Sequence, residues 1–148
     1  MTGATGHKTL ESFPIRIAET VRFCDMDAYG HVNNAVYFRF FESARMAYLE
    51  KIDFCLDLAE PGAGPILAET RCRFRLPLTH PDTVDVGARI TTLDRRWFEM
   101  EYCVVSREHD RVAAEGDARV VVYDYAARRK CELPSSVRLA IEALEKSR

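Results

Sequence analysis

The pattern that most constrains the fold is one long segment of helical periodicity followed by four segments of strand periodicity. Between residue 36 and about Ile52, apolar side chains recur at helical spacing, at Val36, Tyr37, Phe40, Phe41, Ala44, Ala47 and Tyr48. After a loop rich in proline and glycine, residues 60–65, apolar and polar residues alternate as in half-buried strands over 68–76, 84–90, 98–104 and 112–122. The links between these strands are short, so we expect neighbouring strands to pair antiparallel.

Two shorter segments lie before and after this series. Alternating apolar residues predict a strand over Pro14 to Phe23, and an amphipathic segment beginning at Pro134 predicts a C-terminal helix. The order strand, long helix, four strands, helix predicts an α+β fold with a curved five-stranded antiparallel sheet. A helix of about 18 residues is ~27 Å long, which is long enough to lie across such a sheet.

Composition limits the class of protein. The 148 residues, 47% hydrophobic and 30% charged, fit one domain, which we place at 13–148 after a disordered tail at 1–12. The 21 basic and 23 acidic residues nearly cancel, which argues against a nucleic-acid partner. No stretch approaches the ~20 apolar residues of a membrane span. Five scattered cysteines without a C-x-x-C pair indicate neither a disulfide framework nor a metal site, and they favour a reducing cytoplasm.

Chemically reactive side chains concentrate in residues 23–34, between the first strand and the long helix. This segment holds two aspartates, a tyrosine, a histidine and two asparagines. A helix start exposes unpaired N–H groups and favours a developing anion, so a nearby carboxylate would have oxyanion donors beside it. A purely structural loop is also consistent with these residues, with Asn33 or Asn34 capping the helix and Gly30 turning the chain.

The whole run D-x-D-x-x-G-H-V-N-N-x-x-Y, from Asp25 to Tyr37, resembles the signature of the 4-hydroxybenzoyl-CoA thioesterase-like hot-dog family. The H-V-N-N part also occurs in plant acyl-carrier-protein thioesterases. The resemblance implies a hot-dog fold and an acyl-CoA thioesterase. We assign no cofactor. The resemblance further implies that Asp27 is the catalytic carboxylate, as nucleophile or general base, and that the backbone N–H of Asn34 polarises the thioester carbonyl.

Two further positions follow from the plant enzymes, where asparagine and histidine are catalytic. They align here with Tyr29, which departs from the pattern, and with His31, which retains it. We expect Asp25, two residues before Asp27, to point the same way in an extended segment, where the two charges would raise one pKa. Asp25 is therefore assigned to support of the loop.

Coenzyme A carries phosphates, and two basic clusters are candidates to bind them. Arg95 and Arg96 precede the fourth strand, where aryl-CoA enzymes have a similar arginine pair, and Arg128 opens the cluster 128–130 after the last strand. Solvated charged turns are the alternative explanation for both. Three further arginines, at 71, 73 and 75, alternate with Cys72 and Phe74. This alternation indicates a strand face that is available to a partner subunit or the nucleotide.

The resemblance also implies assembly, because two hot-dog protomers pair edge to edge and share active sites. We therefore expect a homodimer, or a homotetramer built from it. Two other functions remain open: a module that binds acyl-CoA or an acyl carrier protein without cleaving it, and a hot-dog hydratase or dehydratase that leaves the thioester intact. Retention of Asp27 favours hydrolysis over mere binding.

Overall fold

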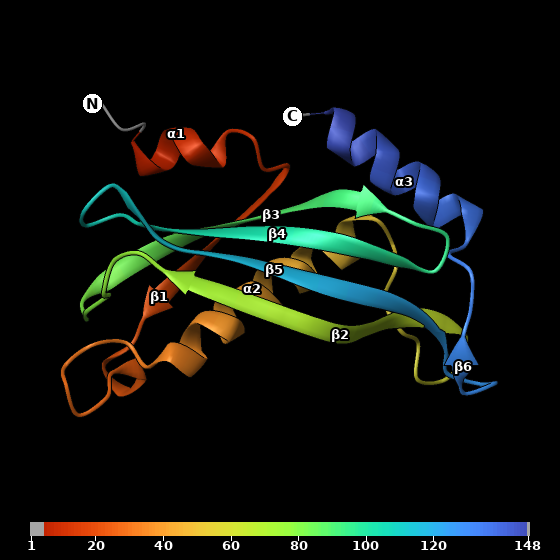
Figure 1. Ribbon diagram of the computed structural model, residues 1–148, viewed down its shortest axis with the longest axis horizontal. Helices are drawn as coiled ribbons and strands as arrows, with labels where there is room; N and C mark the ends of the chain where they lie inside the picture. Colours follow the sequence, from red (N-terminus) through yellow and green to blue (C-terminus); the bar gives the residue numbers. More distant parts are fainter. Residues whose placement is uncertain (1–4, 148) are drawn as a thin grey trace.

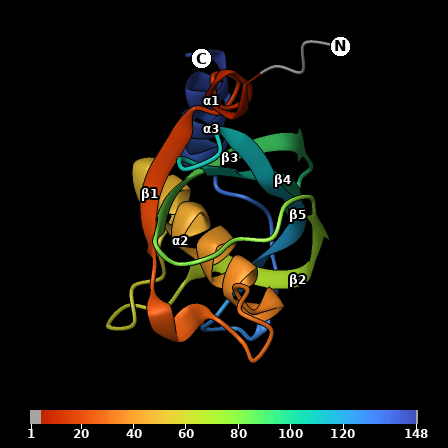
Figure 2. The same ribbon diagram turned by 90° about the vertical axis from the view of Figure 1, so that its left-hand side faces the viewer.

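The computed structural model describes residues 5–147, in which a strongly curled antiparallel sheet wraps around one long helix. Figure 1 shows the sheet from its outer side, and Figure 2 looks along the helix. The strands are β1 (Ile15–Val21), β2 (Ala63–Phe74), β3 (Asp82–Leu93), β4 (Trp97–Ser106) and β5 (Arg111–Asp124), in the order β1-β3-β4-β5-β2. A two-residue strand, β6 (Arg129–Lys130), pairs with β5. This confirms the predicted α+β hot-dog fold.

The long helix is α2 (Asn34–Lys51), close to the predicted limits. Asn33 caps it, since its side-chain oxygen accepts the N–H of Ala35. The face toward the sheet is fully or almost fully buried and consists of Tyr37, Phe40, Phe41, Ala44, Tyr48 and Leu49. Gly116 of β5 permits this close packing, because a Cβ there would lie 2.4 Å from the Cε2 atom of Phe41.

Strand β2 begins earlier than predicted, at Ala63, within the segment expected to be a loop. Pro65 is compatible with a strand here because β2 is an edge strand, where a missing N–H donor on the open side costs no ladder bond. Several apolar side chains on β2 are exposed, among them Ile66 at 40% and Leu67 at 43%. The free edge and these side chains leave β2 without a covering element among the described residues.

The expected disordered tail at 1–12 differs in its described part, because residues Gly6–Leu10 form helix α1. Residues 1–4 lie outside the described part of the chain. Leu10 and Phe13 are buried, and they pack with Cys103 and Val105 in a small second core on the outer face of the sheet. Gly87 of β3 makes room for it, since a Cβ there would lie 2.7 Å from Phe13. Two buried apolar side chains explain why this segment is ordered.

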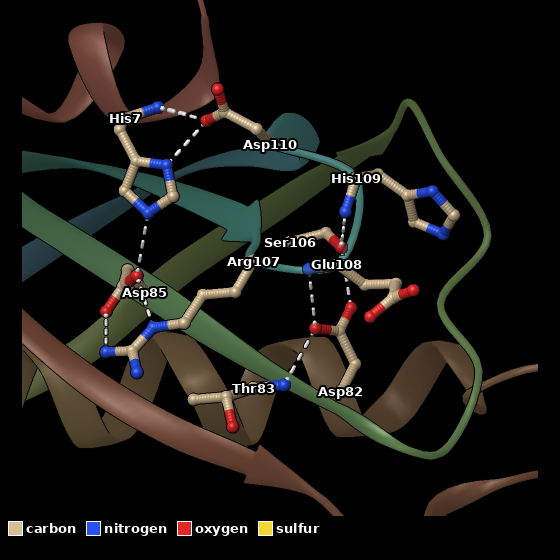
Figure 3. Close-up of polar contacts among 9 residues, drawn as sticks. All are labelled: His7, Asp82, Thr83, Asp85, Ser106, Arg107, Glu108, His109 and Asp110. Atoms are coloured by element: carbon tan, nitrogen blue, oxygen red, sulfur yellow. Dashed lines mark hydrogen bonds and ion pairs between the residues drawn. The ribbon is translucent and has the colours of Figure 1, made fainter.

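Polar contacts hold α1 against the sheet (Figure 3). The ring of His7 lies between two carboxylates, with Nδ1 2.5 Å from Asp110 and Nε2 3.3 Å from Asp85. Arg107 binds the same Asp85 through two hydrogen bonds of 2.8 Å each. The N-terminal helix is therefore fixed to β3 and to the β4–β5 turn.

The predicted C-terminal helix is present as α3 (Ser135–Lys146), which packs on the sheet through Val137 and Ile141. Helix α1 lies on the outer side of the sheet, away from α2 (Figure 2). The buried side chains of α3, in contrast, belong to the same core as the buried face of α2. No helix within residues 5–147 is long and apolar enough to cross a membrane.

Candidate active site

The connection between β1 and α2 is a compact turn built by backbone hydrogen bonds. The N–H of Asp27 donates to the carbonyl of His31 at 2.8 Å, and the N–H of Gly30 donates to the carbonyl of Asp27 at 3.1 Å. Gly30 has a φ of 79°, a left-handed conformation that glycine adopts without strain. The turn places Asp27 a few residues before the start of α2.

Asp25 is buried and forms an ion pair, contrary to the expectation that it would point the same way as Asp27. The reason is local, because residues Phe23–Asp25 form a 3-10 turn, η1, and not an extended strand. The Asp25 carboxylate accepts two hydrogen bonds of 3.0 Å from Arg39 of α2 and one of 2.9 Å from the N–H of Arg22. Burial raises the pKa of Asp25, but the bonds from Arg39 and Arg22 outweigh burial and hold that pKa below its ordinary value.

Asp27, in contrast, is exposed and borders a cavity of about 550 Å³. The loop and the start of α2 contribute Asp27, His31, Val32, Asn33, Asn34 and Tyr37, and the end of β2 contributes Phe74, Arg75, Leu76 and Pro77. One carboxylate oxygen of Asp27 accepts the N–H of Tyr29 at 2.9 Å, which orients the carboxylate. The other oxygen has no protein donor within residues 5–147. A carboxylate in this setting can serve as a base or a nucleophile.

The start of α2 lines the same cavity through Asn33 and Asn34. The N–H groups of Ala35 and Val36 donate to Asn33, at 3.0 and 2.9 Å. The N–H of Asn34 has no hydrogen-bond partner among the described residues, as expected for a first helical position. It is therefore available to an oxygen atom of a ligand, next to the positive end of the helix dipole.

The structure brings Asp27, His31 and Asn34 together at one cavity, while other predicted site residues lie outside it. Tyr29 is 87% exposed at the tip of the turn and does not line the cavity. The β3–β4 turn, which carries Arg95 and Arg96, and the β5–β6 turn with Arg128 lie at the opposite end of the sheet (Figure 1). Arg95 also forms an ion pair with Glu132.

Sequence reasoning did not place the end of β2 at the predicted catalytic loop. Phe74 packs edge to face on Tyr37, with ring centroids 5.0 Å apart, and Leu76 lies beside them, so one wall of the cavity is apolar. The alternation at 71–75 indicated a strand face, but no local signal shows that its far end meets the α2 start. Within residues 5–147, no group of three His, Cys, Asp or Glu side chains is arranged to hold a metal ion.

Comparison with known proteins places this geometry in a family. Residues 21–141 match the family model described as the thioesterase-like superfamily. The chain belongs to this superfamily. The match begins at the end of β1 and ends in α3, so it contains the loop, the whole of α2 and the four following strands. The predicted class of enzyme, a thioester hydrolase, is confirmed at the level of the family.

Several proteins that are similar to this chain are themselves described as thioesterases. A chloroplastic acyl-acyl carrier protein thioesterase of Arabidopsis thaliana is 31% identical over 121 residues, which are 80% of this chain and 62% of that protein. The long-chain acyl-CoA thioesterase of Escherichia coli is 23% identical over 85% of this chain and 96% of its own. A thioesterase of Thermus thermophilus, solved in complex with coenzyme A and zinc, superimposes with a TM-score of 0.80 at 35% identity, covering 93% of this chain and 99% of its own.

Proposed function

We propose that this protein hydrolyses an acyl-CoA thioester to the free acid and CoA, with Asp27 as the catalytic carboxylate. The observation that carries the proposal is the position of an exposed, oriented carboxylate and an unpaired helix-start N–H at one cavity. A thioester has a good leaving group, so its hydrolysis needs mainly an oxygen nucleophile and stabilisation of the tetrahedral oxyanion. Asp27 and Asn34 supply these two requirements.

In this mechanism the thioester carbonyl oxygen accepts the N–H of Asn34, and the carbonyl carbon faces Asp27. Asp27 then either deprotonates the attacking water or attacks the carbon to form a mixed anhydride that water hydrolyses. In both routes the sulfur leaves as the CoA thiolate and takes up a proton. His31 lies at the same cavity and is the candidate donor of that proton, whereas Tyr29 contributes through its backbone N–H to Asp27.

The acyl group would lie against the apolar wall of the cavity, formed by Tyr37, Phe74 and Leu76.

We further propose a homodimer in which the free β2 edges of two protomers pair, with a tetramer as the higher assembly. This pairing would bring the far end of the partner's sheet, with Arg95, Arg96 and Arg128, toward the cavity of the first protomer, where these arginines would meet the CoA phosphates. The free thiols support a cytoplasmic location.

The experiment compares wild type with Asp27→Asn on a panel of aryl, short-chain, long-chain and polar acyl-CoA thioesters, following release of free thiol. We expect the variant to lose at least ~10²-fold in turnover, as for removal of a general base, while keeping its fold and oligomeric mass. Activity retained in the folded variant would exclude Asp27 as the catalytic group. Absence of hydrolysis by wild type, with acyl-CoA still bound, would favour the binding module; conversion of an enoyl- or hydroxyacyl-CoA without thiol release would favour the hydratase.

A further inference from the structure

One cation borders the proposed active-site cavity and has no part in the proposed hydrolysis. Asp27, His31 and Arg75 line the cavity, and only the first two act in the proposed mechanism. The side chain of Arg75 is 54% exposed, so solvent and ligands reach it. An exposed arginine that lines the same cavity as the reacting carboxylate would affect which thioesters bind.

The end of β2 places Arg75 among the residues that line the cavity. The N–H groups of Arg75 and Leu76 both donate to the carbonyl of Ala113, at 2.8 and 3.1 Å. Two consecutive donors on one acceptor interrupt the regular ladder in the manner of a β-bulge, which re-aims neighbouring side chains. This explains how residues 74–77 all border one cavity, although successive residues of a regular strand point to opposite faces.

Glu115 of β5 holds the guanidinium in place. Its Oε2 atom accepts a hydrogen bond from Nε of Arg75 at 3.1 Å and lies 3.0 Å from Nη2. The Nη1 donors have no partner among the described residues. The guanidinium is thus oriented on one side and has free donors on the other, an arrangement suited to a second oxyanion.

We propose that Arg75 is a substrate-binding residue that recognises an anionic group of the thioester, either a phosphate of the carrier or a carboxylate of the acyl group. The inference rests on the proposed function, since it identifies a substrate group bound at that same site. Both groups offer paired oxygen atoms to the planar fork of an arginine.

Arg73 provides a matched control. It lies two residues earlier on β2, it is also exposed, and it borders a different hollow on the outer face together with Glu101, Glu115 and Asp117. Glu115 is also the partner of Arg75, but Glu101 and Asp117 add two carboxylates around Arg73, and these disfavour an anionic ligand there. Removal of its charge changes the net charge of the protein by the same amount as removal of the Arg75 charge, without touching the Asp27 cavity.

The test measures KM and kcat for wild type, Arg75→Gln and Arg73→Gln with three thioesters. The first is the CoA thioester of the neutral acyl group that wild type hydrolyses fastest. The second carries the same acyl group on N-acetylcysteamine, which has no phosphate. The third carries a succinyl group on N-acetylcysteamine. We expect Arg75→Gln to raise KM about tenfold, with kcat unchanged, only for a thioester that carries the recognised anion. An effect confined to the CoA thioester assigns a phosphate, and one confined to the succinyl thioester assigns a carboxylate.

The proposal is overturned if Arg75→Gln alters all three substrates equally, alters none, or acts no differently from Arg73→Gln. If wild type hydrolyses none of them, the proposed function fails independently. Calorimetric titration with the CoA thioester and the succinyl thioester then decides the role of Arg75. Binding weakened by Arg75→Gln but not by Arg73→Gln supports that role, and unchanged binding of both ligands excludes it.

Discussion

At the residue scale, two aspartates separated by one residue have different environments. The side chain of Asp25 is 3% exposed and bonded to Arg39, whereas Asp27 is exposed at a cavity and bonded to one loop N–H. The carbonyl of Asp25 also accepts the N–H of Asn33, so the buried pair connects β1, the loop and α2. We infer that Asp25 and Arg39 keep Asp27 and the Asn34 N–H in fixed relative positions.

This division of roles predicts opposite effects of two similar substitutions. Asp25→Asn should lower the free energy of unfolding by about 2 kcal/mol, because it weakens charge-assisted hydrogen bonds of a buried carboxylate. Asp27→Asn should change that free energy by less than ~0.5 kcal/mol, as for most exposed positions, while abolishing most turnover. Urea unfolding followed by circular dichroism measures both values. Equal destabilisation by the two substitutions would contradict the division.

At the scale of elements, α1 shows how a short polar segment becomes ordered by its partners. Leu10 supplies apolar contact, and His7 supplies polar contact to β3 and to the β4–β5 turn. For both ring nitrogens of His7 to donate to carboxylates, the imidazole must carry both protons. Hydrogen bonding to Asp110, opposed by slight burial and aided by Asp85, raises the pKa of His7 above its ordinary value.

The sign of the resulting pH dependence follows from this shift. Because the folded pKa of His7 is above the unfolded one, its stabilisation is complete below about pH 6.5 and is lost as the pH rises through the raised pKa. The pKa values of Asp85 and Asp110 are lowered, so both remain charged in that window. The contribution of α1 docking should therefore be greater at pH 5.5 than at pH 8.5.

We expect His7→Gln to lower Tm by roughly 1–3 °C at pH 5.5 and to have little effect at pH 8.5, since exposed ion pairs contribute at most about 1 kcal/mol. Differential scanning calorimetry at the two pH values measures this. His109→Gln is the control, because its ring forms no hydrogen bond or ion pair within residues 5–147. A loss of Tm that is the same at both pH values would show that His7 acts by packing alone.

At the scale of the whole molecule, the sheet curls around α2 between its two edge strands, β1 and β2, and leaves one face of the helix exposed, at Glu42, Met46 and Glu50. Strand β2 is one of those edges and carries exposed apolar side chains, so the protomer has a surface suited to a second copy. The proposed cavity lies partly on the end of this same strand. Assembly and activity should consequently be linked.

Leu67→Glu should weaken the proposed dimer by about 2 kcal/mol, or ~30-fold in Kd, because it places a charge in a buried interface. Sedimentation analysis should then show the monomer mass at concentrations where wild type is dimeric, together with reduced thioester turnover. Leu139→Glu on α3, where the native side chain is 66% exposed, is the control and should change neither property. A wild-type protein that is monomeric and fully active would exclude the proposed assembly.

The sequence by itself determined the element order, the long helix, the antiparallel strands and the family. These depend on local periodicity, as in residues 36–52, and on one contiguous run from Asp25 to Tyr37. The run also identified Asp27, His31 and Asn34, which the structure places at one cavity. Such features are readable because the residues that produce them are neighbours in the chain.

Only the tertiary structure decided which distant residues meet. It showed the Asp25–Arg39 pair, the contact of Phe74 with Tyr37 in the first turn of α2, and the docking of α1. Leu10 and Phe13 were the only local signal for α1, and two apolar residues in a polar stretch do not predict an element without the surface that buries them. These contacts form when the sheet curls around α2, because curvature, and not sequence spacing, brings the end of β2 to the start of the helix.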